Sequence, residues 1–439
     1  TAVGYRGLDA NTTGANNTAV GKGAMTNNTT AADNTAVGKE ALLTNTTGAC
    51  NTAIGVGALT ANTTAAENTS IGSASMLGNT TGTKNVAVGR CSLRCNTTAD
   101  DNTAVGHASL FANTTGTRNV AVGCGALAAN TTADCNVAVG RAALEANTTG
   151  AENTALGTGA LGTNTTGCRN TALGRSALVL NTTGIENIAV GRNTLDANTE
   201  GSNNTAIGNS SLTTNTTGAN NTAVGKDALS RNTTGSSNTA IGLNALYENT
   251  TADNNAAVGR SALEVNTTGN LNNAVGNFAL CKNTTGGCNT AIGYRAMLSN
   301  TEGARSTAVG TDALCSNTVN GGHTAVGRLA LAKNTTGDAN TAVGTCAIFT
   351  NTTGGFNVSV GVNSLKLLTT GCCNVAVGKD AGENTTTGSN NHGFGHAACA
   401  SSATVSNQIT LGNGSNDNLR CADTSISSLS DLRDKENIE

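Results

Sequence analysis

Hydrophobic and polar positions recur along this chain with a fixed period. Glycine occupies residue 4 and every seventeenth position after it up to Gly412, which makes 25 copies without an insertion or deletion. Numbered as columns one to seventeen from Asn17, the unit reads Asn-Thr-Ala-Val-Gly-x-x-Ala-Leu-x-x-Asn-Thr-Thr-Gly-x-x. A chain that coils in register on itself cannot add a residue to one turn without shifting every later column. The pattern therefore predicts a solenoid of 17-residue rungs.

The aliphatic columns predict where the core lies. Column four is almost always Val, Ile or Leu, as at Val20 and Ile54, and column nine is Leu or Met, as at Leu42. We expect both columns to be buried. Columns three and eight are almost always Ala or Ser, as at Ala19 and Ala24, which predicts a surface that another backbone approaches closely. Columns six and seventeen vary and often carry charge, so we expect them to be exposed.

The local structure follows from the alternation of side chains. In Asn-Thr-Ala-Val, Thr and Val would face one side of a short strand and Ala the other. Gly then turns the chain, a second strand carries Ala-Leu, and Asn-Thr-Thr-Gly makes a second turn in which Asn and Thr side chains bond to the backbone. The predicted fold class is an all-β parallel β-solenoid, or β-roll, with two short strands and two turns per rung. Aliphatic residues in fixed columns argue against a disordered low-complexity chain.

Composition limits the thickness of the core. The 439 residues include no Pro or Trp and only 2% aromatic residues, so the core must be thin. Burial of one Val and one Leu supplies only a part of the free energy that ordering a 17-residue rung costs. Hydrogen bonds between rungs, and packing of the small-residue face against identical chains, would supply more. We therefore expect a parallel homotrimeric fibre about 120 Å long.

Charge and hydropathy argue against several classes of partner. The net charge of −3 gives no electrostatic indication of nucleic-acid binding, and no segment approaches 18 consecutive apolar residues, so we expect no membrane insertion. The four His residues do not lie at metal-ligand spacing with the cysteines, and the glycines are interpreted as rung turns, not phosphate loops. We expect no metal, no cofactor and no catalysis on an external substrate.

Three groups of residues remain open to more than one interpretation. The 14 cysteines lie mostly in variable columns, so they are free thiols or form bridges within or between chains, with Cys91–Cys95 and Cys281–Cys288 as candidate pairs. Most copies carry Asn-Thr-Thr from column twelve, which is a sequence for N-glycosylation but is better explained as one turn copied many times. Lys and Arg recur in column six, where a solvated face is the simplest interpretation.

The repeated block resembles a known family. Asn-Thr-Ala-Val-Gly, followed by a small residue and Leu, resembles the head repeats of trimeric autotransporter adhesins, whose chains form left-handed parallel β-rolls in threes. The unit here is longer than in that family. The resemblance covers roughly residues 1–415 and implies a trimeric fibre.

The C-terminal segment resembles a second family. The run Ser-Ser-Leu-Ser-Asp-Leu-Arg-Asp-Lys-Glu-Asn-Ile, which begins at Ser427, resembles the opening of the intramolecular chaperone domain that follows phage tail spikes and tail fibres. In that family a Ser and a Lys five residues later form a self-cleaving dyad, which maps onto Ser430 and Lys435. The bond cut would join Leu429 and Ser430. On spacing alone, a helix that begins at Ser430 would explain the same residues.

These resemblances imply three parts and a function. Residues 1–415 would be the shaft, 416–429 a linker, and 430–439 the truncated start of the chaperone domain, which would gather three chains in register. The expected function is a structural and adhesive fibre shaft of a phage or virus, exposed on the virion or outside the cell. Its tip would bind a host receptor or glycan, and autocleavage would complete its maturation.

Two alternatives to the viral fibre remain. One is a bacterial surface adhesin or extracellular fibre. The other is an ice-binding solenoid, indicated by Thr in columns two, thirteen and fourteen, although Glu200, Glu302 and Val319 interrupt the Thr rows.

Overall fold

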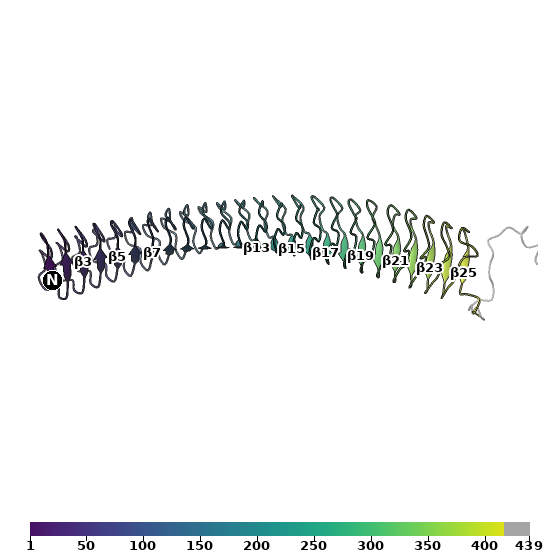
Figure 1. The fold of residues 1–439 in the computed structure, drawn as a ribbon, viewed down its shortest axis with the longest axis horizontal. Helices are drawn as coiled ribbons and strands as arrows, with labels where there is room; N and C mark the ends of the chain where they lie inside the picture. Colours follow the sequence, from purple (N-terminus) through teal and green to yellow (C-terminus); the bar gives the residue numbers. More distant parts are fainter. Residues whose placement is uncertain (417–439) are drawn as a thin grey trace, which may run out of the picture.

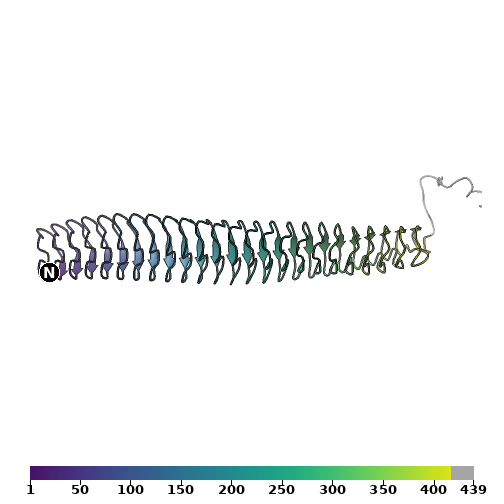
Figure 2. The same cartoon turned by 90° about the horizontal axis from the view of Figure 1, so that it is seen from above.

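The computed structural model describes residues 1–416 and shows a single β-solenoid (Figures 1 and 2). Each rung contributes one short strand, and the rungs stack in chain order into a long, gently curved rod (Figure 1). The described residues contain no helix. The strands are β1 (Ala2–Val3), β2 (Thr18–Val20), β3 (Thr35–Val37), β4 (Thr52–Ile54), β5 (Thr69–Ile71), β6 (Val86–Val88), β7 (Thr103–Val105), β8 (Val120–Val122), β9 (Val137–Val139), β10 (Thr154–Leu156), β11 (Thr171–Leu173), β12 (Ile188–Val190), β13 (Thr205–Ile207), β14 (Thr222–Val224), β15 (Thr239–Ile241), β16 (Ala256–Val258), β17 (Asn273–Val275), β18 (Thr290–Ile292), β19 (Thr307–Val309), β20 (Thr324–Val326), β21 (Thr341–Val343), β22 (Val358–Val360), β23 (Val375–Val377), β24 (His392–Phe394) and β25 (Ile409–Leu411).

Each strand pairs in parallel with the strands of the rungs before and after it. The register is the same throughout and matches each column with itself, so Ala206 of β13 lies opposite Ala189 of β12 and Ala223 of β14. One sheet of 25 strands therefore runs along the rod, and the side chains of each column form a row. The predicted all-β parallel solenoid with 17-residue rungs is confirmed.

The segment that carries Ala-Leu is not a strand. Leu229 of column nine has a φ of 52° and Asp227, two residues earlier, a φ of 57°, and these left-handed values recur in nearly every rung. Strands require negative φ, so each rung has one strand and a succession of turns. The prediction of two strands per rung is wrong. Hydrogen bonds between rungs nevertheless continue through the turns, as from Leu229 N to Ala245 O (2.9 Å).

Two structural constraints require glycine in column five. Gly225 has a φ of 137°, a conformation that residues with a side chain rarely adopt. A Cβ at this position would also lie 2.5 Å from the carbonyl oxygen of Gly242 in the next rung. Backbone conformation and the close approach of the next rung together explain why this column does not vary.

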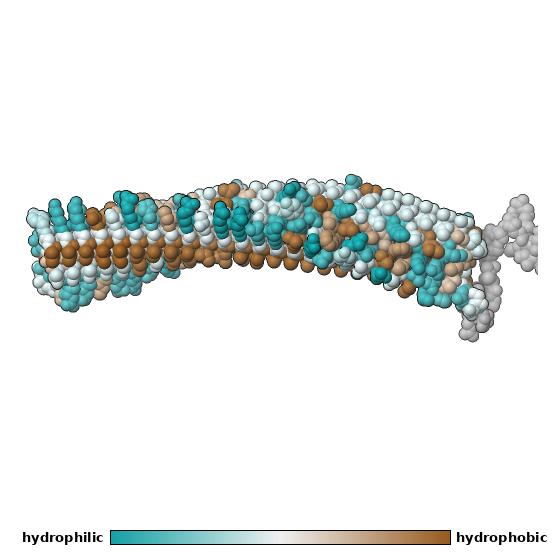
Figure 3. All heavy atoms as spheres, in the orientation of Figure 1, coloured by the Kyte–Doolittle hydropathy of each residue, from teal (hydrophilic) through white to brown (hydrophobic). Residues whose placement is uncertain are grey.

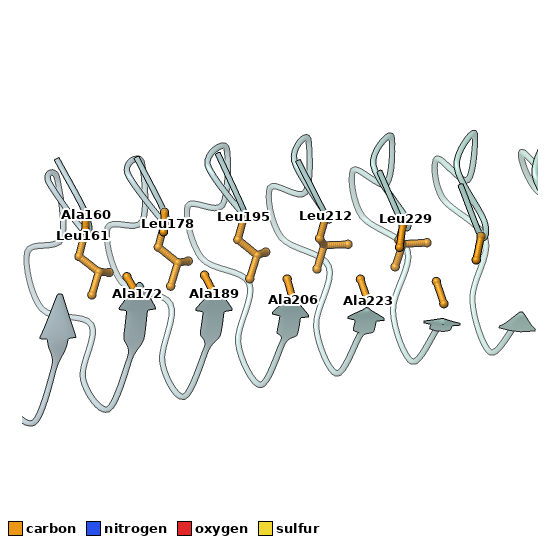
Figure 4. Close-up of a cluster of buried hydrophobic side chains, with 14 of the residues drawn as sticks. Ala160, Leu161, Ala172, Leu178, Ala189, Leu195, Ala206, Leu212, Ala223 and Leu229 are labelled. Carbon is orange, nitrogen blue, oxygen red and sulfur yellow. The ribbon is translucent and has the colours of Figure 1, made fainter. Parts of the chain in front are cut away.

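The core is a narrow row of small and branched side chains. Ala of column three, Ala or Ser of column eight and Leu or Met of column nine are buried almost throughout. In Figure 4, Leu195 and Leu212 extend from the turn side of the rung toward Ala189 and Ala206 on the strand side. The predicted burial of column nine is confirmed. A three-residue strand leaves room for about one Leu and two Ala in each rung, which explains the low aromatic content.

The expectation that column four is buried is wrong. Thr and Val do share one face of the strand as predicted, but this face points outward, and Ile54 is 38% exposed. The small residues point inward instead, and Ala19 and Ala24 are fully buried. The surface that we expected to meet another chain is therefore the interior of each rung. The physical reason is that the Leu of column nine fills the space opposite the strand, so that only Ala fits against it.

Buried asparagines of column twelve link neighbouring rungs. Asn215 Nδ2 donates to Asn198 Oδ1 (2.8 Å) and to Gly218 O (3.0 Å), and Asn215 Oδ1 accepts from Asn232 Nδ2 (2.8 Å). Each such Asn donates to a backbone carbonyl of its own turn and also bonds to the Asn of the neighbouring rungs, so these side chains form a ladder along the rod. The predicted turn role of Asn-Thr-Thr is confirmed, and the amide nitrogen that a glycan would need is buried in the folded chain.

Column one forms a second ladder. The backbone N of Asn221 donates to Asn204 Oδ1 (3.0 Å), while Asn221 Nδ2 donates to Gly235 O in the next turn (2.9 Å). The two ladders therefore meet at the turn carbonyls of column fifteen. Most of these carbonyls receive a donor from both ladders, as Gly218 O does from Asn204 and Asn215, so they are paired although the turn is buried.

The ladders change in the C-terminal third of the rod. Ser306 and His323 replace Asn in column one and remain acceptors, since His323 N donates to Ser306 Oγ and Asn340 N to His323 Nδ1 (3.2 Å each). In column twelve, Leu368 ends the run of asparagines. The Oδ1 of Asn351 is consequently buried without a hydrogen-bond partner.

Candidate functional surface

The most extensive chemical feature of the rod is an apolar surface along the outer face of the sheet. We call it the outer strip and define it as the side chains of columns two and four of β1 to β25. Column four is aliphatic up to Val377, with exposures such as 50% for Leu156, and column two is mostly Thr, Val or Ile. Figure 3 shows the strip as a continuous band on the N-terminal half of the rod. Along 25 strands it is about 120 Å long and about 10 Å wide.

A second surface is formed by column six, which comes directly after the strand and its glycine in each rung. Column six is exposed in every rung from Lys22 to His396, as predicted. In several rungs its basic residue makes an ion pair with the residue that follows it in the chain. Lys39 contacts Glu40 (3.4 Å) and Lys379 contacts Asp380 (3.1 Å). Exposed pairs of this kind contribute little to stability. The basic residues of column six are thus a solvated face, interrupted by neutral residues.

The described cysteines are free thiols. No disulfide joins any cysteine within residues 1–416, so the candidate pairs Cys91–Cys95 and Cys281–Cys288 are not bonded in the structure. Burial, together with the adjacent Glu264 carboxylate, raises the pKa of the Cys281 thiol to about 11. This thiol is therefore protonated and unreactive at neutral pH. Bridges between chains stay a prediction.

The interior of the rod offers no room for a ligand near its C-terminal end. Gly382 takes the place of the column-nine Leu, and Gly393 the place of the column-three Ala. The resulting cavity has a volume of about 10 Å³. A single water molecule needs about this much space, so the cavity is a local packing defect.

The residues predicted for self-cleavage lie outside the described part of the chain. Ser430, Lys435 and the bond after Leu429 fall in residues 417–439. Among residues 1–416, no cluster of three or more His, Cys, Asp or Glu side chains is placed to hold a metal ion. The described residues also include no helix that is long and apolar enough to cross a bilayer.

Comparison with known proteins does not assign the chain to a family. No protein-family model matches the sequence, and no curated protein matches it significantly. Function must therefore be argued from the outer strip, the ladders and the repeat itself.

Proposed function

We propose that the chain is the shaft of a fibre on a virion surface or outside a cell, in which copies of the chain associate in parallel through the outer strip. The observation that carries this proposal is the strip itself. Its aliphatic column four runs for about 120 Å without interruption, and at a width of about 5 Å its area is on the order of 600 Å², at the upper end of the contiguous apolar patches that soluble monomers expose. A regular apolar surface of this size is typical of an interaction site.

A second copy of the same chain is the partner that fits every rung. The strip presents one aliphatic side chain per rung at the strand spacing, and an identical strip has the same spacing over its whole length. An unrelated partner would match it at only a few positions. The number of three chains rests on the resemblance to trimeric autotransporter heads. The tip of such a fibre would bind a host receptor or glycan.

Substitution in the outer strip tests the self-association. Val224 of column four is half-exposed in the single chain, so Val224→Asp should leave the rung folded. In an assembly the same carboxylate would be buried and unpaired, which is costly. We expect Val224→Asp to lower the yield of trimer at least tenfold in sedimentation velocity, while the matched variant Lys226→Asp, at an exposed position two residues later, assembles normally. A monomeric wild type, or equal assembly of both variants, would contradict the proposal.

The proposal includes maturation by self-cleavage. Lysine can act as a general base toward a serine hydroxyl when its pKa is lowered, and the C-terminal string supplies Ser430 and Lys435 for these roles. A chain extended through the downstream domain should release that domain by a cut between Leu429 and Ser430. The Ser430→Ala variant should stay full length and still form trimers. An intact wild-type chain in mass spectrometry, under conditions where trimers form, would remove this part of the proposal.

The alternative functions predict the same solenoid shaft but a different location and a different use of its surface. A bacterial adhesin or extracellular fibre would associate through the same strip, and a signal peptide and membrane anchor in the full gene would favour it. Ice binding ranks lower because the Thr hydroxyls of column thirteen are already donors to the next rung, as from Thr216 Oγ1 to Thr233 O (3.0 Å). Only columns two and fourteen would be left to order water.

A further inference from the structure

Two aromatic side chains meet on the ridge formed by columns six and seven. The rings of Phe278 and Tyr294 lie on consecutive rungs in an edge-to-face arrangement, with centroids 6.3 Å apart and planes at 79°. They are the only stacked ring pair within residues 1–416. Phe278 also has a φ of 60°, in a column that Gly, Ala, Ser, Asn or Asp fills in most rungs. Leu329 and Arg295 of the same column have φ values of 61° and 57°, so the aromatic side chain and not the backbone sets the rung of Phe278 apart.

One end of this ring pair carries an arginine that has no carboxylate partner. The guanidinium of Arg260 lies over the Phe278 ring, with Cζ 5.4 Å from the centroid, and its side chain makes no ion pair with any residue from 1 to 416. At the other end, Arg295 lies over the Tyr294 ring (5.8 Å) but is paired with Asp312 (3.2 Å). Of the two arginines, only Arg260 is therefore free to bind an anion.

A similar cluster elsewhere on the rod differs because its arginine has a carboxylate partner. Arg231 lies over the ring of Tyr247 (5.3 Å), but its Nη1 also donates to Glu248 (2.8 Å). That carboxylate already occupies the position an anionic ligand would take. Arg94 over Phe111 and Lys333 over Phe349 also make no ion pair within residues 1–416, but each lies over a single, half-buried ring. The cluster of Arg260, Phe278 and Tyr294 is thus distinguished by its second ring, since Tyr294 is 47% exposed.

We propose that Arg260, Phe278 and Tyr294 form a binding site for a saccharide that carries a carboxylate. The guanidinium lies over the Phe278 ring and has no carboxylate partner within residues 1–416, so its N–H groups are free for the two parallel hydrogen bonds that a carboxylate accepts. The exposed part of Tyr294, two rungs and so about 10 Å further along, offers an apolar surface to the C–H groups of a sugar ring. A disaccharide, made of the acidic sugar and the sugar linked to it, would span the distance from Arg260 to Tyr294.

An acidic peptide fits the site less well. Peptides gain affinity on β-proteins mainly by adding a strand to an open sheet edge. Here every strand from β2 to β24 is already paired on both sides, and the ridge is outside the sheet. Only side-chain contacts would be left to a peptide. The proposal is independent of the fibre function, because it uses a different side of the rung from the outer strip.

Binding of defined oligosaccharides tests the site. The probes are 3′-sialyllactose and a trimer of galacturonic acid, with lactose and the methyl-esterified trimer as their uncharged counterparts. By saturation-transfer NMR and calorimetry on the full chain, we expect at least one acidic probe to bind at least tenfold more tightly than its counterpart. Arg260→Gln and Tyr294→Leu should each weaken that binding about tenfold or more, and added salt should weaken it further.

The control is an arginine in the same column without the aromatic neighbours. Arg192 is exposed in column six like Arg260, but Ser210 occupies the position that corresponds to Phe278. Arg192→Gln should bind the acidic probe as the wild type does. Three results would overturn the proposal: neither acidic probe binds better than its counterpart, Arg192→Gln loses as much as Arg260→Gln, or a tetraglutamate peptide competes as well as the saccharide.

Discussion

Interrupting the column-twelve ladder should destabilise the rod in proportion to the number of interruptions and not to the number of asparagines removed. In Asn215→Leu/Asn232→Leu the replaced rungs are adjacent, so Asn198 Oδ1 loses its donor and Asn249 Nδ2 loses one acceptor. In Asn215→Leu/Asn249→Leu an intact Asn232 separates them, so the Oδ1 atoms of Asn198 and Asn232 both lose their donors. The Nδ2 atoms of Asn232 and Asn266 each lose an acceptor as well. The two variants have the same composition and the same number of new leucines.

The difference between the variants is one buried acceptor and one buried N–H group. Leaving a buried polar atom without a partner costs about 1–3 kcal/mol, so the separated pair should be less stable by at least about 2 kcal/mol, or at least roughly thirtyfold in a local opening equilibrium. The turn carbonyls add nothing to this difference because they keep a donor from column one, as Gly218 O does from Asn204 Nδ2 (2.9 Å). Asn351, whose Oδ1 faces Leu368, shows that the rod tolerates one such acceptor.

Native-state hydrogen exchange is the suitable assay, since repeat proteins open locally and a single global unfolding free energy would average the effect. Peptides that cover residues 198–266 should exchange at least roughly thirtyfold faster in the separated variant than in the adjacent one. Equal exchange, or faster exchange in the adjacent variant, would refute the reasoning that unpaired polar atoms at the interruptions dominate the energetics of the ladder.

Two further predictions concern single positions. Gly225→Ala should lower stability by roughly 2–4 kcal/mol because its Cβ would overlap the next rung, whereas Gly159→Ala, whose Cβ meets nothing within 4 Å, should lose about 1 kcal/mol for its left-handed backbone; similar melting temperatures would contradict this. Burial lowers the pKa of His323, whose Nδ1 accepts from Asn340 N. The unfolded chain therefore binds more protons, so stability should be lost as the pH falls below about 6.5. Urea unfolding at two pH values should show this loss in the wild type and less of it in His323→Asn.

The fold was predictable because the repeat leaves few choices. An invariant glycine in every repeat specifies the coil and its register, and Leu in column nine marks the core correctly. The same pattern misplaced column four, because alternation along a strand says which side chains share a face but not which face is inside. The narrow interior decides that question, and it depends on the left-handed turn of Leu229 and its equivalents, for which Leu gives no sequence signal.

The candidate surfaces were less predictable than the fold. The outer strip was visible in the sequence as an aliphatic column but was assigned to the core. The cluster around Phe278 and Tyr294 was missed. These residues are 16 positions apart in the chain, and their proximity is visible only when consecutive repeats are aligned. A comparison of columns six and seven across consecutive rungs would have found Arg260, Phe278 and Tyr294 together.

Register is the remaining problem for any assembly of this rod. Two parallel outer strips that slip by one rung still place aliphatic side chains against each other, so the strip alone distinguishes poorly between correct and slipped pairings. The rungs that differ from the consensus are concentrated toward the C-terminus, where His392 and Phe394 enter the strip and Leu368 ends the ladder. In most other rungs a slip only exchanges Thr, Val and Ile in column two and one aliphatic residue for another in column four, so it changes the contacts most at this end. Chains that align first at this end would extend the correct register along the uniform rungs, which is the order that a C-terminal chaperone would impose.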